Sequence, residues 1–244
     1  MWAASATTAA LLSGGKADAI ISCGCSGAHV LGQKMGDLVV GEHVMPLDPH
    51  VIARDGGVTY SGVRFSMTTK GTTLWPADAH LLDLAKAAAA EVKARRAPNM
   101  RIDHGIVGSG DAWRQSPAVI HDVHDKTGSL CEEMEAHAVA QVADRFEVPF
   151  VAIKDIANSE LQPEEIQLEP THHIVPDSCK VGYNAALVTE SVVRMLAGVP
   201  PAEVPRHAST ASSSTPSSPI AHGKRSRSAA SSSSASPVVR ARHD

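Results

Sequence analysis

The apolar positions of this chain fall into two patterns, one typical of strands and one typical of helices. Short runs rich in β-branched residues predict buried strands at residues 17–22, 38–45, 101–107 and 148–153. Apolar positions at helical spacing, or a high content of Ala and Leu, predict helices at residues 3–13, 77–96 and 177–197. Strands that alternate with helices in this way indicate an α/β domain.

The stretch from Cys131 to Asn158 carries the most information, because it joins a helix to a strand and has polar residues at both ends. Glu132, Glu133 and Glu135 are predicted to lie at the start of the helix, where the helix dipole favours carboxylates. Pro149 separates this helix from the apolar run that follows, which predicts a buried strand.

Polar residues follow that strand, in a segment that we expect to be a loop. They are Lys154, Asp155 and Asn158. In open α/β sheets, ligands bind beyond the carboxyl ends of the strands. The sequence therefore predicts that Glu135 and a residue of the 154–158 loop lie beside one pocket.

Two glycine-containing turns are each predicted to follow a strand directly. The first is CGCSGAH, residues 23–29, and the second is GSGDAW, residues 108–113. Such turns let backbone N–H groups approach a ligand closely, although a plain tight turn explains the first one equally well. Trp113 is either a core residue or a stacking wall for a flat ring.

Two long segments interrupt the pattern of helices and strands. Residues 46–75 predict a loop with a hairpin at 58–65, and residues 159–176 predict a proline-punctuated loop or lid. His172 and His173 have no carboxylate or cysteine partner at ligand spacing, so we expect exposed loop histidines rather than metal ligands. Asp177 is the expected N-cap of the last helix.

The composition changes near residue 200. Residues 200–244 are rich in Ser, with Pro, Ala and basic residues and no apolar period, which predicts disorder. Lys224, Arg225 and Arg227 form a small basic cluster that we interpret as part of a solvated tail. We therefore expect one domain over residues 1–199 and a disordered tail over 200–244.

The composition limits the classes of binding partner and the cellular compartment that we expect. Hydrophobic residues make up 43% of the chain but aromatic residues only 3%, so each Trp or Phe is informative. The net charge of −4 argues against nucleic acid as a partner. Four cysteines without zinc-like spacing suit a reducing compartment, and we expect a cytoplasmic protein. No run is long enough to span a membrane, and the start lacks the basic residues of a secretory signal.

Four segments are similar to motifs of one known family. EEMEAHAVAQVADRFEVPFVAIK, residues 132–154, is similar to its VEMEA…A…VPF…R block, and SGDAW, residues 109–113, to its SGDAF purine-binding turn. IISCGCSGAH, residues 20–29, is similar to its INTGSAGG turn, and MGDLVVGE, residues 35–42, to its VGDIVVSD strand. On these segments the chain resembles the nucleoside phosphorylase superfamily over residues 1–197, in particular the 5′-methylthioadenosine/S-adenosylhomocysteine nucleosidases.

This resemblance implies a fold and a class of ligand. The fold is a three-layer α/β/α arrangement with a central mixed sheet. The ligand is a small purine nucleoside, with no cofactor and no metal. Family members are usually dimers or hexamers, so the resemblance implies a homo-oligomer.

The resemblance also implies roles for the residues around the nucleoside. Glu135 accepts hydrogen bonds from the ribose 2′- and 3′-hydroxyls, with Glu133 in the same site, and Met134 packs under the sugar. Trp113 takes the place of the family's phenylalanine and stacks on the base.

Further residues follow from the two turns. Ser109 and Asp111 are implied to shape the purine-binding turn, with turn capping as the alternative interpretation. The anomeric carbon is implied to lie near the first turn, at Cys25, Ser26 and Gly27.

The sequence departs from the family in two places. Family chains usually open with a strand and hairpins before the first helix, whereas this sequence begins at that helix. We therefore expect the domain to lack the first strands and the loop whose acidic residue activates water. In addition, Asn158 occupies the position of the family's general acid, an aspartate, and an asparagine can only donate a hydrogen bond. Asp155, three residues earlier, is the alternative proton donor.

Three functions remain open at this point. Phosphorylases of the superfamily hold phosphate with an arginine before the first glycine turn, and this chain has Ser22 there. Hydrolysis of methylthioadenosine or S-adenosylhomocysteine is therefore favoured over phosphorolysis. The substitution at Asn158 also leaves a catalytically impaired, nucleoside-binding or storage-type relative as an alternative.

Overall fold

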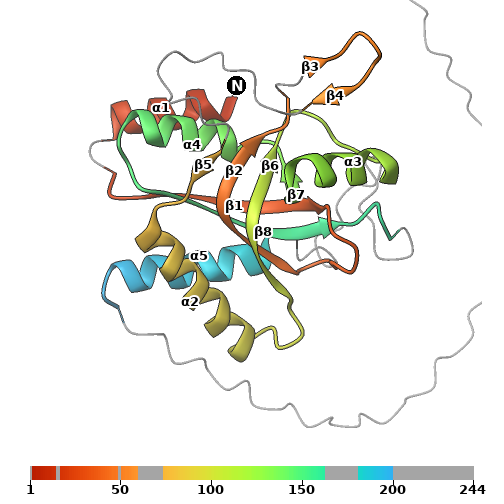
Figure 1. Ribbon diagram of the computed structural model, residues 1–244. Helices are drawn as coiled ribbons and strands as arrows, with labels where there is room; N and C mark the ends of the chain where they lie inside the picture. The colour runs from red at the N-terminus through yellow and green to blue at the C-terminus, as the bar shows by residue number, and fades with distance from the viewer. Residues whose placement is uncertain (1, 15–16, 49–50, 60–73, 163–180, 200–244) are drawn as a thin grey trace, which may run out of the picture. The chain divides into compact units, whose positions relative to one another are not determined.

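The computed structural model describes residues 2–14, 17–48, 51–59, 74–162 and 181–199, which all fall within one compact unit, residues 1–202. Its helices are α1 (Trp2–Ser13), α2 (Ala79–Arg95), α3 (Pro117–Thr127), α4 (Ala136–Arg145) and α5 (Tyr183–Leu196). Its strands are β1 (Ile20–Ala28), β2 (Leu38–Pro46), β3 (Val51–Ile52), β4 (Val58–Thr59), β5 (Trp75–Pro76), β6 (Ile102–Ser109), β7 (Ser129–Glu133) and β8 (Phe150–Asn158). The predicted alternation of strands and helices is thus present (Figure 1).

Six strands form one mixed sheet in the order β5-β2-β6-β7-β1-β8. The pairs β2–β6, β6–β7 and β1–β8 are parallel, whereas β1–β7 and β2–β5 are antiparallel. Strand β8 also pairs with β2, antiparallel, and this pairing closes β2, β6, β7, β1 and β8 into a ring. The mixed sheet confirms the expected fold, and its closure was not predicted.

Helices cover both faces of the sheet, because neighbouring residues of one strand point to opposite sides. Leu38 and Val151 pack with the buried residues of α2 and α5. The adjacent Val39 and Ala152 pack instead with the alanines of α4. Figure 1 shows α2 and α5 on one side of the sheet and α4 on the other, which confirms the three-layer arrangement.

The strands around the predicted pocket are longer than the sequence indicated. Residues 23–28 continue β1 instead of forming a turn, and residues 154–158 continue β8 instead of forming a loop. The parallel pairing of β1 with β8, from Ile20 opposite Phe150 to Gly27 opposite Asn158, provides backbone partners for both segments. All nine residues of β8 are buried, including its polar end.

The predicted helix start at residues 131–133 is wrong. These residues lie in β7, which pairs with β1 and β6 and buries alternate residues. Helix α4 begins only at Ala136, with Glu135 as its N-cap. The acidic cluster therefore spans the end of a strand and the junction to a helix, so its carboxylates point in different directions.

Other helices differ from prediction at their ends. Helix α2 begins after Asp78, whose Oδ1 accepts a hydrogen bond from Leu81 N at 3.0 Å. Gly182, at φ 76°, is the N-cap of α5. The predicted cap Asp177 lies outside the described residues, as do the histidines at 172–173, most of the 58–65 hairpin and the 200–244 tail. Helix α3 was not predicted.

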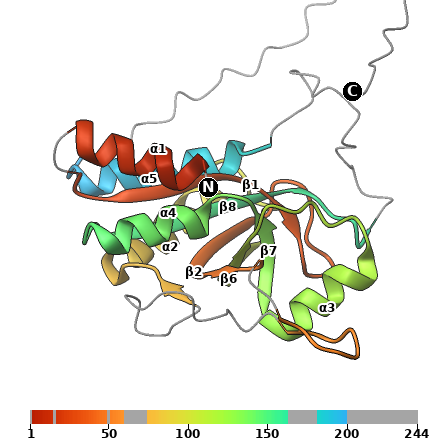
Figure 2. The same ribbon diagram turned by 90° about the horizontal axis from the view of Figure 1, so that it is seen from above.

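Helix α1 corresponds to the helix predicted at residues 3–13, but none of its residues is buried. Trp2 is 90% exposed and Leu12 is 72% exposed. The helix lies alongside α4 rather than against the sheet (Figures 1 and 2). Within the described part of the chain, no helix has the length and apolar character needed to cross a membrane.

Candidate active site

A cavity of about 360 Å³ opens where the ends of β1, β7 and β8 meet the segment that follows β6. This volume falls in the range of pockets that bind small molecules. Its wall combines apolar residues with four glutamates and one arginine. The lining residues are Cys25, Ser26, Gly27, Ala28, Ala112, Trp113, Arg114, Ile120, Glu132, Glu133, Met134, Glu135, Ala157, Asn158, Glu160 and Val181.

Most of the residues predicted from sequence lie in this wall. They are Cys25, Ser26, Gly27, Trp113, Glu133, Met134, Glu135 and Asn158. Trp113 is 47% exposed and Met134 is 41% exposed, so both present apolar surface that a ligand can cover. Trp113 is therefore not a core residue. Burial, followed by the charge of Asp155, raises the pKa of Cys25, which keeps this thiol neutral at the cavity wall.

Gly27 of β1 lies where residues of three neighbouring strands, β1, β7 and β8, meet at the cavity. It lies opposite Asn158 of β8 and opposite Glu132 of β7. A Cβ atom at Gly27 would lie 3.7 Å from Asn158 Oδ1 and 3.8 Å from Glu132 Cγ. The bare backbone of Gly27 thus lies between these two side chains at the cavity wall.

The turn before Trp113 is shaped by its glycines, as expected. A Cβ atom on Gly110 would lie 2.7 Å from Asp48 Oδ1, so any larger residue would have to displace the Asp48 carboxylate. Both carboxylate oxygens of Asp48 accept a hydrogen bond from the Asp111 N–H at 3.0 Å. Ser109 Oγ accepts one from the His137 N–H, which ties the turn to α4. Ser109 and Asp111 are not among the lining residues, and the contact of Ser109 Oγ is consistent with the turn-capping interpretation for Ser109.

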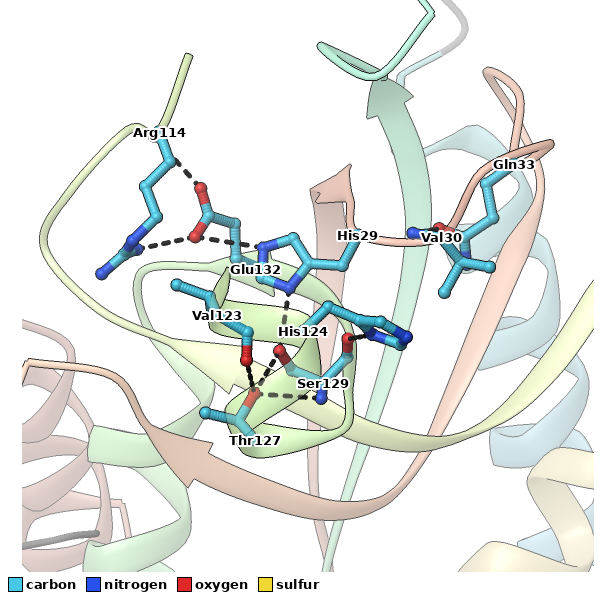
Figure 3. A network of polar contacts seen from close by, with 9 residues as sticks. All are labelled: His29, Val30, Gln33, Arg114, Val123, His124, Thr127, Ser129 and Glu132. Carbon is cyan, nitrogen blue, oxygen red and sulfur yellow. Dashed lines mark hydrogen bonds and ion pairs between the residues drawn. The ribbon is translucent and has the colours of Figure 1, made fainter. Parts of the chain in front are cut away.

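Arg114, directly after Trp113, forms an ion pair that the sequence analysis missed. Arg114 Nη1 lies 2.6 Å from Glu132 Oε2, and the Arg114 N–H donates to Glu132 Oε1 at 3.2 Å. His29 Nε2 lies 3.3 Å from the same carboxylate, and His29 Nδ1 lies 2.8 Å from Ser129 Oγ (Figure 3). The network fixes the segment that carries Trp113 to β7 and β1.

The charge of Glu132 is stabilised by this network. Burial alone would raise the pKa of Glu132, but the nearby His29 ring and the Arg114 guanidinium outweigh burial and lower it. Glu132 is therefore a carboxylate near neutral pH. Because Arg114 and His29 are far from Glu132 in sequence, no local pattern indicates this contact.

Glu133 lies at the cavity wall but has a structural task. Its carboxylate accepts hydrogen bonds from the N–H groups of Glu135 and Ala136, at the start of α4. Lys154 Nζ lies 2.8 Å from Glu133 Oε2, and both side chains are at most 3% exposed. This fixed junction leads directly into the neighbouring Glu135, which is exposed and lines the cavity.

Asp155 does not line the cavity, so the structure argues against it as the alternative proton donor. Its carboxylate accepts hydrogen bonds from the N–H groups of Gly182, Asn184 and Ala185 and thereby caps α5 from a neighbouring strand. Burial raises the pKa of Asp155 to about 6, although these N–H groups and the charge of Lys154 oppose the increase.

This pKa predicts a pH dependence of stability. The folded-state pKa of about 6 lies above the ordinary 3.8, so the contribution of Asp155 is fully present below the ordinary value and is lost as the pH rises through 6. Between pH 4 and pH 8, the wild type should lose up to about 3 kcal/mol of unfolding free energy relative to Asp155→Asn. Denaturant unfolding of both proteins at several pH values measures this difference. A difference that stays constant over this range would contradict the assignment.

Asn158 ends β8 at the cavity, and it is 7% exposed. Its Nδ2 donates a hydrogen bond to Glu160 Oε1 at 3.1 Å. Glu160 also lines the cavity, although it belongs to none of the sequence motifs described above. The group expected to act on the base is therefore an amide in contact with a carboxyl group.

Comparison with known proteins identifies the family. Residues 2–182 match the model of the phosphorylase superfamily. The chain belongs to this superfamily. The 5′-methylthioadenosine/S-adenosylhomocysteine nucleosidase of Geobacillus sp. (strain WCH70) is 31% identical over 161 residues, which are 64% of this chain and 64% of that relative. The chain thus matches a little less than two thirds of that relative's length.

Two further comparisons also find similarity to nucleosidases of this name. The nucleosidase of the same name from Haemophilus influenzae (strain PittEE) is 29% identical over 194 residues, which are 79% of this chain and 77% of that relative. The crystal structure of the nucleosidase of that name from Neisseria meningitidis, in complex with methylthio-immucillin-A, has a TM-score of 0.61 at 24% identity. It covers 79% of this chain and 76% of that one. At this identity the structural likeness shows the phosphorylase-superfamily fold.

Proposed function

We propose that the protein hydrolyses the N-glycosidic bond of 5′-methylthioadenosine or S-adenosylhomocysteine and releases adenine and the thioribose. The observation that carries this proposal is that Trp113, Met134, Glu135 and Asn158 line one cavity. A flat apolar ring, a flexible apolar side chain, a carboxylate and an amide match the base, the sugar ring, its diol and a purine nitrogen. The names of the relatives support this substrate class.

The charges of the cavity wall favour water over phosphate as the nucleophile. Arg114 is the single Lys or Arg among the described lining residues, and Glu132 already neutralises it. Of the three further glutamates in the wall, Glu133 is paired with Lys154, and the described lining residues include no further Lys or Arg that could neutralise Glu135. A phosphate dianion entering this cavity would meet a net negative charge, which costs free energy at short range.

The experiment is to incubate the purified full chain with methylthioadenosine, in the presence and absence of phosphate, and to measure free adenine. Release of adenine at the same rate without phosphate supports hydrolysis. Release that requires phosphate would make the protein a phosphorylase. Binding by calorimetry without any release would support the nucleoside-binding or storage-type alternative, which the amide at Asn158 favours.

A variant at Asn158 tests how the base is protonated. Asn158→Asp is expected to raise turnover about tenfold, because it places a titratable proton where the amide now lies. Its carboxyl would lie beside that of Glu160, and two carboxyls in contact share a proton near neutral pH. Steady-state kinetics of adenine release measure the change. An unchanged or lower rate would show that a carboxylic acid at position 158 does not speed protonation of the base.

We further propose a homo-oligomer, a dimer or a hexamer, that acts in cytoplasmic nucleoside catabolism and methionine salvage. The resemblance to the nucleosidase family and the exposed apolar residues of α1, Trp2 and Leu12, support an oligomer. Analytical ultracentrifugation of the full chain tests it.

A further inference from the structure

A purine leaves readily only when a ring nitrogen receives a proton, because the purine anion is a poor leaving group. Asn158 lies where the resemblance places the proton donor, but an amide has no titratable proton. Asp155 directs its carboxylate to the N-terminus of α5 and does not line the cavity. Among the described lining residues, another acidic group is therefore needed to supply this proton.

Glu160 is the carboxyl group that contacts Asn158. Its Oε1 accepts the hydrogen bond from Asn158 Nδ2 at 3.1 Å, and Glu160 itself lines the cavity. A carboxyl group has two oxygens, so this contact leaves a second oxygen that can carry a proton.

The other three glutamates of the cavity wall are each assigned to another contact or role. Glu132 pairs with Arg114, and Glu133 pairs with Lys154 and two backbone N–H groups. Glu135 lies at the start of α4, where the proposed function requires a carboxylate for the ribose diol. Among the described lining residues, Glu160 is thus the glutamate placed beside Asn158 and not committed elsewhere.

We propose that Glu160 is the general acid of this site and that Asn158 positions the base against it. This role rests on the proposed function. As the bond between C1′ and N9 breaks, its electron pair passes to the purine, and the Glu160 proton moves to N7. The oxygen of a water molecule then bonds to C1′, and a proton released by that water restores Glu160.

The test compares two leaving groups in Glu160→Gln, which keeps the size of the side chain but has no acidic proton. Turnover of methylthioadenosine should fall about 100- to 10,000-fold. Turnover of 4-nitrophenyl riboside should stay within about threefold, because nitrophenolate leaves without a proton. Glu190→Gln, at an exposed position of α5, is the matched control and should leave both rates unchanged.

A double variant tests whether the loss in Glu160→Gln comes from the missing acidic proton. Adding Asn158→Asp to Glu160→Gln should restore methylthioadenosine turnover at least about tenfold, because a carboxylic acid returns to the base. Methylthioadenosine turnover within threefold of wild type in Glu160→Gln, or loss of both substrates without rescue, would overturn the role of Glu160. Wild-type turnover is the separate measure of the proposed function, and its absence would overturn both proposals.

Discussion

Replacing Glu135 by alanine is expected to weaken nucleoside binding by about 3 kcal/mol, roughly a hundredfold in Kd. Glu135 lines the cavity next to Met134, and it follows a junction held by the Glu133–Lys154 ion pair. A carboxylate can accept hydrogen bonds from two neighbouring hydroxyls at once, and a bond to a charged acceptor is stronger than a neutral one. Alanine removes both acceptors.

Calorimetry with a non-cleavable methylthioadenosine analogue measures this change in affinity. Glu135→Gln keeps one acceptor without the charge, so its affinity should fall between those of the wild type and the alanine variant. Glu190→Ala, in an exposed ion pair on α5, controls for loss of negative charge. Unchanged affinity in Glu135→Ala would show that the ribose is not held at this position.

Replacing Lys154 by methionine is expected to lower the unfolding free energy by about 3–5 kcal/mol. Lys154 and Glu133 lie 2.8 Å apart, with their side chains 3% and 2% exposed. Methionine fills similar space, but it leaves the Glu133 carboxylate buried without a cation. Because Glu133 holds the start of α4 through Ala136, nucleoside binding should weaken together with stability.

Denaturant unfolding measures this loss of unfolding free energy. Two further variants serve as controls. Adding Glu133→Gln to Lys154→Met removes the buried charge and keeps an acceptor for Ala136, so it should restore much of the loss. Lys126→Met breaks an exposed ion pair with Asp122 and should cost less than about 1 kcal/mol. A loss that small for Lys154→Met would mean that water reaches Glu133.

Local sequence patterns predicted those helices and strands whose formation depends on a single continuous stretch of sequence. The strands at residues 38–45 and 101–107 and the helix at 77–96 occur with small shifts at their ends. Helix α3 was missed, although Ser116, Pro117 and Gly128 are typical of its two ends. Closure of the ring was not predictable in this way, because β8 pairs with β2 more than 100 residues earlier.

In the candidate site, too, local motifs predicted individual residues but not their distant partners. Trp113, Met134 and Asn158 were predicted at the pocket, because they belong to short motifs. The partners that hold such residues come from distant parts of the chain. Asp155 caps a helix that begins 28 residues later, and no local pattern distinguishes that task from one at the cavity.

The closed ring also determines how the site responds to unfolding. Strand β8 is bonded to β1 on one side and, over residues 152–155, to β2 on the other, so we expect the amide hydrogens of residues 152–155 to exchange slowly with solvent. Asn158, Gly27 and Glu132 come from three strands of that ring. We therefore expect loss of the site to accompany opening of the ring, and hydrogen exchange of β8 measures that opening.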